Sequence, residues 1–205
     1  PFIKELKNDF EGEIYDDKIH RNIYALDASV FEVLPLFVII PKSQQDVQKL
    51  IDLARQHHLS LTFRGAATST TGASLGKEIV VDCSKYLNKI HSVDPMNKSV
   101  WVEPGVVQDR LNEFLAPHNL RLGPDTSSGS RATIGGMIGN NSSGARSLKF
   151  GCTWDAVSEI KLLLASGEQI HLKDLSESEY EQKLKLKNNE GRRSEEHTSE
   201  LQSPC

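Results

Sequence analysis

Glycine is concentrated in one part of this 205-residue chain. Half of the 14 glycines lie between Gly123 and Gly151, and serine and threonine are interspersed among them. Glycine allows a positive φ and lets a ligand approach the main chain closely. We therefore expect this stretch to form loops that hold a ligand, rather than the interior of regular elements.

A second segment, residues 64–72, has the same character. It follows an apolar run and reads Arg64-Gly65-Ala66-Ala67-Thr68-Ser69-Thr70-Thr71-Gly72. Small side chains let backbone N–H groups form a concave nest for an anion, and hydroxyl groups add neutral donors. A diphosphate fits these donors better than a metal, because no cluster of carboxylates accompanies them. The alternative is a flexible linker rich in serine and glycine.

The spacing of the glycines argues against two familiar nucleotide-binding motifs. A Walker loop requires Gly-Lys followed by serine or threonine, which neither segment contains. A Rossmann fingerprint requires G-x-G-x-x-G between a strand and a helix. The run Ile134-Gly135-Gly136-Met137-Ile138-Gly139 has its glycines at a different spacing.

The first half of the chain has the pattern of an α/β unit. Residues 35–40 read as a buried strand, and Ser43 begins a helix with Asp46 placed as in a capping box. Residues 59–63 and 78–82 read as further strands. A strand, a helix and a strand of this size predict parallel pairing. Residues 1–34 are charged, and we expect them to be a helical lead-in to the domain.

The second half alternates between short elements and loops. Apolar patterning predicts strands at 89–93 and 99–102, a helix over 107–115, and a strand pair at 157–165 and 169–172. The polar residues 173–192 are typical of a surface loop or helix.

Composition excludes several classes of protein. The net charge of −4, without a dense Lys/Arg stripe, argues against a nucleic-acid partner. The three cysteines show no metal-ligand spacing, so we expect no metal site and a reducing, cytoplasmic compartment. The longest apolar run, residues 36–40, is too short to span a bilayer.

The last residues, 193–205, have an unusual sequence. The run from Arg193 to Ser203 resembles the translation of a sequencing adapter, so we leave residues 193–205 out of the fold prediction. We expect the natural reading frame to continue from about residue 192, which makes this chain an N-terminal fragment.

Five motifs in order carry a resemblance to a known family. They are Arg64-Gly65-Ala66-Ala67-Thr68-Ser69, Val102-Glu103-Pro104-Gly105-Val106, Gly123-Pro124-Asp125-Thr126-Ser127-Ser128, Thr133-Ile134-Gly135-Gly136-Met137, and Asn140-Asn141-Ser142-Ser143-Gly144. Together with Tyr24-Ala25-Leu26-Asp27-Ala28-Ser29 they resemble the FAD-binding PCMH-type domain of the vanillyl-alcohol oxidase and p-cresol methylhydroxylase superfamily. The D-lactate and glycolate dehydrogenase-like flavoproteins are the most similar branch. The resemblance spans roughly residues 20–172.

The resemblance implies an α+β fold of two lobes with FAD between them. A small parallel α/β lobe would cover about residues 35–95, and a mixed-sheet lobe, incomplete here, about residues 96–192. The first loop would hold the pyrophosphate, and the later loops would line the flavin and its ribityl chain. The implied cofactor residues are Arg64, Gly65, Ala66, Ala67, Thr68, Ser69, Thr70, Gly72, Pro124, Asp125, Thr126, Ser127, Ser128, Thr133, Ile134, Gly135, Gly136, Asn140, Asn141, Ser142 and Gly144.

The resemblance also implies an activity. Some relatives attach the flavin through a histidine in the first loop, where this chain has Thr68, so we expect non-covalent FAD. The complete protein would be an FAD-dependent dehydrogenase or oxidase of a 2-hydroxy acid such as D-lactate, glycolate or 2-hydroxyglutarate. Substrate and electron acceptor would bind through domains beyond this chain, which holds no catalytic residue and would be inactive alone. Peripheral attachment to the inner membrane is compatible with a cytoplasmic location. The alternatives are another FAD-linked oxidase or reductase of the superfamily and a non-catalytic flavin-binding module.

Overall fold

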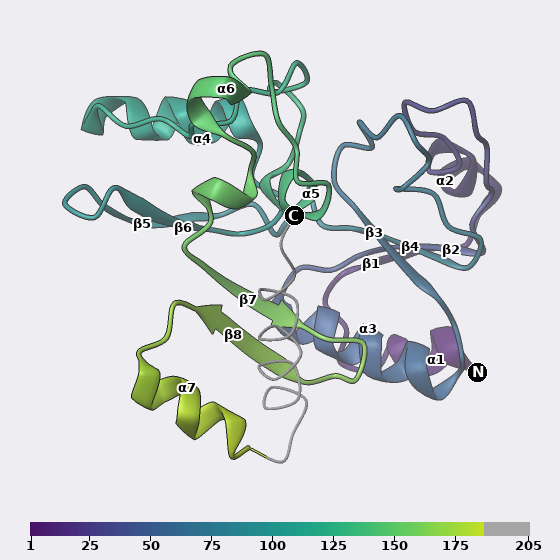
Figure 1. The fold of residues 1–205 in the computed structure, drawn as a ribbon. Coiled ribbons are helices and arrows are strands. Elements are labelled where there is room, and N and C mark those ends of the chain that lie inside the picture. The colour runs from purple at the N-terminus through teal and green to yellow at the C-terminus, as the bar shows by residue number, and fades with distance from the viewer. Residues whose placement is uncertain (187–205) are drawn as a thin grey trace. The chain divides into compact units, whose positions relative to one another are not determined.

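The computed structural model describes residues 1–186 (Figure 1). The chain divides into two compact units. The first contains residues 1–157 together with Ala165–Gly167, and the second contains Ser158–Leu164 and the described residues from Glu168 to Leu186. The adapter-like run 193–205 lies outside the described residues.

A four-stranded sheet organises the beginning of the first unit. Its strands are β1 (Glu13–Tyr15), β2 (Phe37–Ile40), β3 (Leu61–Arg64) and β4 (Ile79–Asp82), in the order β1-β2-β4-β3. β4 is parallel to both β2 and β3, which confirms the parallel pairing predicted for this segment. The prediction did not anticipate that β4 inserts between β2 and β3. β4 is buried along its whole length, as expected of a central strand covered on both faces.

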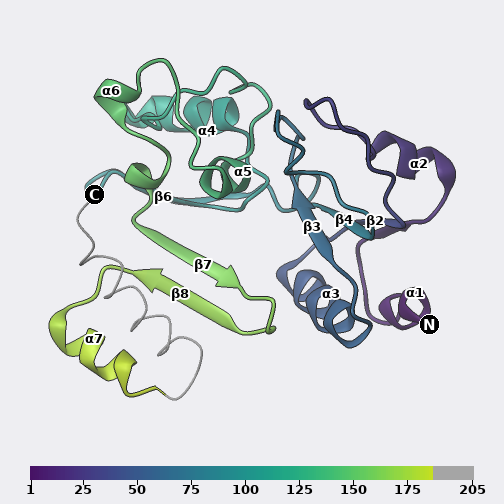
Figure 2. The same cartoon turned by 45° about the vertical axis from the view of Figure 1, so that its right-hand side comes forward.

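Two helices pack on one face of this sheet. α1 (Phe2–Leu6) and α3 (Gln44–Gln56) lie beside each other below the strands (Figures 1 and 2). Their buried apolar residues form one cluster with the sheet, which consists of Phe2, Leu6, Ile39, Leu50, Ile79 and Val81.

The start of α3 differs in one detail from the predicted capping box. Ser43 caps the helix, because its side chain accepts from the N–H of Asp46 at 3.1 Å. The Asp46 carboxylate does not return to the N–H of Ser43. It accepts instead from the N–H groups of Lys42 (2.8 Å) and Glu11 (3.1 Å). Asp46 thereby ties the N-terminal segment to the helix, a contact between residues far apart in sequence.

The description of residues 1–34 as a helical lead-in was wrong in part. The segment contains α1 and α2 (Lys18–Ile23), but it also contributes β1. β1 pairs antiparallel with β2, with Ile14 opposite Ile39. Charged residues on both sides of a three-residue strand obscured its pattern, so the strand was not recognised. This segment is an edge of the sheet.

The rest of the first unit is built on a hairpin and short helices. β5 (Ile90–Asp94) and β6 (Ser99–Val102) pair antiparallel, and α4 (Gln108–Leu115) follows. Then come η1 (Ala116–His118), α5 (Ile134–Gly139), α6 (Ser147–Phe150) and η2 (Trp154–Ala156). Their core contains Val106, Leu111, Leu115, Ala132, Ile134 and Met137. The predicted lobe boundary at 95/96 was misplaced, because it cuts the β5–β6 hairpin, whose Ile90 and Val93 pack on this second core.

The second unit is a hairpin followed by a helix. β7 (Glu159–Leu163) and β8 (Gln169–Lys173) pair antiparallel, with Lys161 opposite His171. In the polar segment predicted as a loop or a helix, α7 (Glu177–Leu184) is helical, and Ser176 with Glu179 forms a reciprocal capping box. Among residues 1–186, none of the helices is long and apolar enough to cross a membrane.

A carboxylate fastens β1 to the loop after β4. Glu13 accepts from Lys85 Nζ at 2.6 Å, from Tyr15 Oη at 2.6 Å, and from the Tyr86 hydroxyl. The hydrogen bonds from Lys85, Tyr15 and Tyr86 lower the pKa of Glu13 to about 2. Because the anion carries these bonds, the ionised form stabilises the edge of the sheet.

We predict that Glu13→Gln destabilises the protein by about 1–2 kcal/mol at pH 7, since it weakens hydrogen bonds to a charged acceptor. The folded-state pKa lies below the unfolded value, so the contribution is complete above about pH 5 and decreases as pH falls toward 2. Urea unfolding at several pH values measures this, and the difference between wild type and variant should shrink below pH 4. Glu11→Gln is the control, because the Glu11 carboxylate has no partner among the described residues. A Glu13 effect that does not change with pH would contradict the assignment.

Candidate functional site

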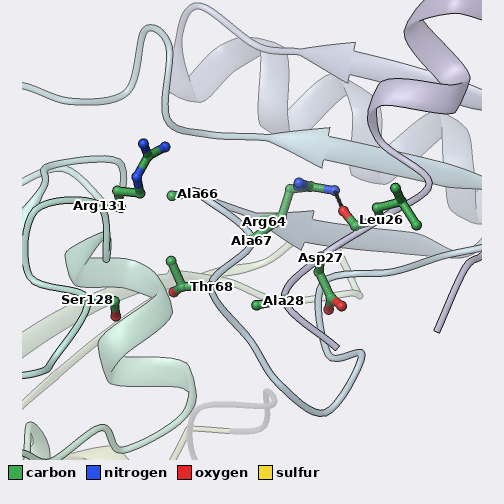
Figure 3. Close-up of a pocket in the computed structure, with 9 residues that line it drawn as sticks. All are labelled: Leu26, Asp27, Ala28, Arg64, Ala66, Ala67, Thr68, Ser128 and Arg131. Atoms are coloured by element: carbon green, nitrogen blue, oxygen red, sulfur yellow. Dashed lines mark hydrogen bonds between the residues drawn. The ribbon is translucent and has the colours of Figure 1, made fainter. Parts of the chain in front are cut away.

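A pocket of about 480 Å³ opens beyond the carboxyl end of β3 (Figure 3). Three segments line it: residues 26–28, the loop that begins with Arg64, and the loop that contains Ser128 and Arg131. The lining residues are Leu26, Asp27, Ala28, Arg64, Ala66, Ala67, Thr68, Ser128 and Arg131. The end of a parallel strand, where β3 and β4 both finish, is a common location for a ligand site in α/β proteins.

Unused donors characterise the loop after β3. Within residues 1–186, the backbone N–H groups of Ala66, Ala67 and Thr68 donate no hydrogen bond to the protein. Ala67 has a φ of +55°, a left-handed conformation that non-glycine residues seldom adopt, and its carbonyl accepts from Ala28 N–H at 3.1 Å. Small side chains and free N–H groups in a turned backbone can bind an anion.

Arg64 brings a positive charge to the same pocket. Its Nη1 donates to the carbonyls of Tyr24 (3.1 Å) and Leu26 (3.3 Å). Its Nε is buried and has no hydrogen-bond partner among the described residues. Burial lowers the pKa of Arg64, and the nearby carboxylate of Asp82 partly offsets this effect. An unpaired buried donor is costly, so a ligand acceptor here would recover free energy.

The other two charged side chains of the pocket, Arg131 and Asp27, differ in whether they already have hydrogen-bond partners within the protein. The Arg131 guanidinium is exposed and has no acceptor within the described part of the chain. Asp27 accepts from Ser29 N–H at 2.8 Å and from Ser74 Oγ at 2.9 Å. Burial raises the pKa of Asp27, but these hydrogen bonds outweigh it and keep the pKa below its ordinary value. Arg64 and Arg131 therefore have donors left for a ligand, whereas the Asp27 carboxylate is already hydrogen-bonded within the protein.

A buried glutamine shapes the second loop. Gln108 is 0% exposed; its Nε2 donates to the Pro124 carbonyl at 2.8 Å, and its Oε1 accepts from Thr126 Oγ1 at 2.6 Å. Sequence reasoning missed Gln108. Its signal was the position: it falls on the same face of α4 as Leu111 and Leu115, where a polar side chain must find partners.

The two glycine-rich regions meet at Gly65. A Cβ on Gly65 would lie 2.1 Å from Thr133 Oγ1, at the residue before α5. The N–H groups of Ile134 and Gly135 donate to the carbonyls of Val106 and Pro104, both at 2.8 Å. The start of α5 is thus bound to the turn after β6, and these two N–H groups are already used within the protein.

Close approach, not positive φ, explains most glycines of residues 123–151. Among the glycines of this fully described stretch, only Gly151 has a positive φ. A Cβ on Gly144 would lie 1.8 Å from the Asp125 carbonyl oxygen, and one on Gly135 would lie 2.6 Å from Pro104 Cβ. Gly136 would meet only Thr133 Oγ1, at 3.2 Å. Positive φ and the approach of a ligand were the expected reasons for these glycines, and the close approach of another chain segment is a third that was not predicted.

The run from Asn140 to Gly144 packs against residues 152–154. Asn141 Oδ1 accepts from Trp154 N–H at 3.1 Å, and the Ser142 carbonyl accepts from Thr153 N–H (2.9 Å) and Thr153 Oγ1 (2.6 Å). Asn140 is the C-terminal cap of α5. These contacts order the segment through its own neighbours.

The structure brings together only part of the predicted set. The predicted residues that line the pocket are Arg64, Ala66, Ala67, Thr68 and Ser128. Gly65, Ser69, Thr70 and Gly72 belong to the same first loop without lining the pocket. The others lie outside the lining: Pro124, Asp125, Thr126, Ser127, Thr133, Ile134, Gly135, Gly136, Asn140, Asn141, Ser142 and Gly144. The site prediction omitted Leu26, Asp27, Ala28 and Arg131, which do line it. No group of metal ligands occurs among residues 1–186.

Mutation of Gly65 and Thr133 tests whether the loop after β3 packs against the start of α5. We predict that Gly65→Ala destabilises the protein by roughly 1–3 kcal/mol, because the added methyl overlaps Thr133. Thr133→Ala removes the two nearest atoms, so the double variant should be more stable than the sum of the single effects implies. Urea unfolding gives all four values. Gly139→Ala is the matched control, since its Cβ would have no neighbour within 4 Å. Equal effects of the Gly65 and Gly139 variants would rule out the contact.

The sequence matches a known protein family and several curated proteins. Residues 35–173 match the family described as the FAD binding domain. The D-2-hydroxyglutarate dehydrogenase of Pseudomonas putida is 37% identical over 185 residues, which is 88% of this chain and 18% of that protein. The glycolate oxidase subunit GlcD of Bacillus subtilis is 31% identical over 76% of this chain and 33% of its own length. The chain therefore spans a third or less of these curated relatives.

Solved structures show the same fold. An alkyldihydroxyacetonephosphate synthase superposes with a TM-score of 0.77 at 23% identity, over 84% of this chain and 34% of that one. The 6-hydroxy-D-nicotine oxidase of Arthrobacter nicotinovorans superposes with a TM-score of 0.71 at 22% identity, over 84% of this chain and 38% of that one. These likenesses confirm the predicted α+β fold, and the match over residues 35–173 shows that the chain belongs to the FAD-binding domain family.

Proposed function

We propose that this chain is the FAD-binding part of a flavin-dependent oxidoreductase that oxidises a 2-hydroxy acid of the D-lactate, glycolate or 2-hydroxyglutarate type. The observation that carries the proposal is a pocket with unused donors and two arginines in a chain 37% identical to a D-2-hydroxyglutarate dehydrogenase. The complete protein would pass electrons to an acceptor, which is its partner. It would be located in the cytoplasm, with peripheral attachment to the inner membrane as an alternative.

The residues of the pocket fit the chemistry of FAD. A diphosphate needs positive charge and several donors near small side chains. The unpaired Nε of Arg64, the free N–H groups of Ala66 to Thr68, and the hydroxyls of Thr68 and Ser128 are donors of this kind. Ala28 and the two alanines of the loop keep space open for the ligand.

The proposed cofactor residues divide into a lining and a support. Arg64, Ala66, Ala67, Thr68, Ser128 and Arg131 would contact the cofactor. Gly65 and the second-loop residues from Pro124 to Gly144 would set the shape of the site. FAD held at this site would supply the hydride-accepting chemistry of the reaction. The chain would bind the cofactor and orient it, and we assign none of the described residues to removal of the substrate proton.

Attachment of the flavin can be tested directly. Thr68 offers a hydroxyl in place of a nucleophilic imidazole, so we predict non-covalent FAD. Acid precipitation of the full-length flavoprotein should leave the yellow chromophore in the supernatant, where its fluorescence and mass identify FAD. Flavin that stays with the precipitated protein would contradict this, and a purified protein without flavin would contradict FAD binding itself.

The substrate class is tested by turnover. The full-length protein should reduce an artificial dye with at least one of D-lactate, glycolate and D-2-hydroxyglutarate. Arg64→Ala should lower flavin content and activity together, because it removes a cation from the cofactor pocket. Dye reduction with none of these acids, by a protein that carries FAD, would refute the substrate class and leave FAD binding intact.

A further inference from the structure

The protein holds the Arg64 guanidinium at one corner only. An arginine has five N–H donors in a rigid plane. Nη1 uses its two on the carbonyls of Tyr24 and Leu26, at 3.1 and 3.3 Å. Nε and Nη2 have no acceptor among the described residues. The edge between them has the geometry that grips two oxygens of a phosphate at once.

Tyr24 fixes the plane of that guanidinium. The guanidinium carbon of Arg64 lies 4.9 Å from the centre of the Tyr24 ring, within the range of a cation–π contact. The same residue supplies one of the two carbonyl acceptors. A ring on one side and two carbonyls at one corner together restrict how the guanidinium can rotate.

Asp82 in turn anchors Tyr24. The Tyr24 hydroxyl donates to Asp82 Oδ2 at 2.6 Å, and Asp82 is 7% exposed. Asp82 Oδ1 accepts from Ser84 N–H and Ser84 Oγ, both at 2.7 Å. Asp82 ends β4 and is paired in register with Arg64 at the end of β3. Tyr24 is therefore hydrogen-bonded to β4, the strand that pairs with β3, which carries Arg64.

We propose that Tyr24, anchored by Asp82, is a positioning residue that holds Arg64, with its unpaired Nε and Nη2 donors, in place for the diphosphate of the dinucleotide. This inference rests on the proposed FAD site. An arginine that is already ordered loses less conformational entropy on binding, so the benefit appears as affinity for phosphate-bearing ligands. Ligands without the diphosphate should not depend on Tyr24.

The competing explanation is that Tyr24 only stabilises the fold. Tyr15 is a matched control for this possibility, because its hydroxyl also donates to a carboxylate, Glu13, at 2.6 Å in the same sheet, and Tyr15 does not line the pocket. Tyr15→Phe and Tyr24→Phe each delete one such hydroxyl and keep the ring. Asp82→Asn weakens the same anchor from its other end.

The experiment is a titration of flavin-free full-length protein with FAD, ADP and riboflavin. We expect Tyr24→Phe to weaken FAD and ADP about threefold to tenfold, as for one lost hydrogen bond, and to leave riboflavin unchanged. Asp82→Asn should act in the same direction, and Tyr15→Phe should leave all three affinities unchanged. In an Arg64→Met background, Tyr24→Phe should have no further effect on FAD or ADP.

The outcomes separate a failure of the positioning role from a failure of the FAD site. Unchanged FAD and ADP affinity in Tyr24→Phe, with wild type binding both, would overturn the positioning role and leave the FAD site standing. An equal loss in the Arg64→Met background, or an equal loss for riboflavin, would also overturn it, because the effect would not pass through Arg64. If wild type binds neither FAD nor ADP, the proposed function fails instead. Should Tyr24→Phe not fold, the Asp82→Asn titration decides between the same outcomes.

Discussion

The contact between Gly65 and Thr133 constrains the whole site. Gly65 follows the last residue of β3, and Thr133 precedes α5, so their approach joins the two glycine-rich regions. The turn after β6 also binds the start of α5, through the N–H groups of Ile134 and Gly135. Without a side chain at residue 65, β3 can end directly against this helix. The pocket then receives Arg64 and its loop from one region and Ser128 with Arg131 from the other.

The charges of the pocket match a dinucleotide although the chain as a whole is negative. The net charge of −4 would not attract an anion at long range. Locally, Asp27 is satisfied by Ser29 and Ser74, and Asp82 by Tyr24 and Ser84. Burial raises the pKa of Tyr24 first of all, and its hydrogen bond to Asp82 adds to this, so the phenol remains a donor. Two arginines with donors to spare are left facing the space where a ligand would bind.

Much of the fold could be predicted from the sequence because its signals are local. The apolar runs of β2 and β4 and the amphipathic α3 have clear periods, and parallel pairing follows from their spacing. The insertion of β4 between β2 and β3 is a choice among long-range pairings, which no local pattern records. β1 was missed because a three-residue strand bordered by charges has too short a pattern to detect.

For the site too, residues marked by a local pattern could be predicted, and residues that act through long-range contacts could not. Arg64 to Thr68 were predictable, because a glycine, small residues and hydroxyls after a strand indicate an anion loop. The segment from Tyr24 to Ala28 was part of the resemblance, but its place in the pocket was not predicted. It and Gln108 act through contacts 16 to 58 residues away along the chain, which only the folded structure shows. Gly135 and Gly144 are needed for close packing between chain segments, a reason that the pattern of glycines and hydroxyls did not reveal.

Hydrogen–deuterium exchange on the flavin-free and FAD-loaded full-length protein tests the central claim most directly. The claim is that the loop after β3 and the loop around Ser128 form one dinucleotide site. FAD should slow exchange at the free N–H groups of residues 66–68 and in the segment containing residues 128–131, with little change in the exposed helix α7. Bound FAD that leaves exchange at residues 66–68 unchanged would contradict the account.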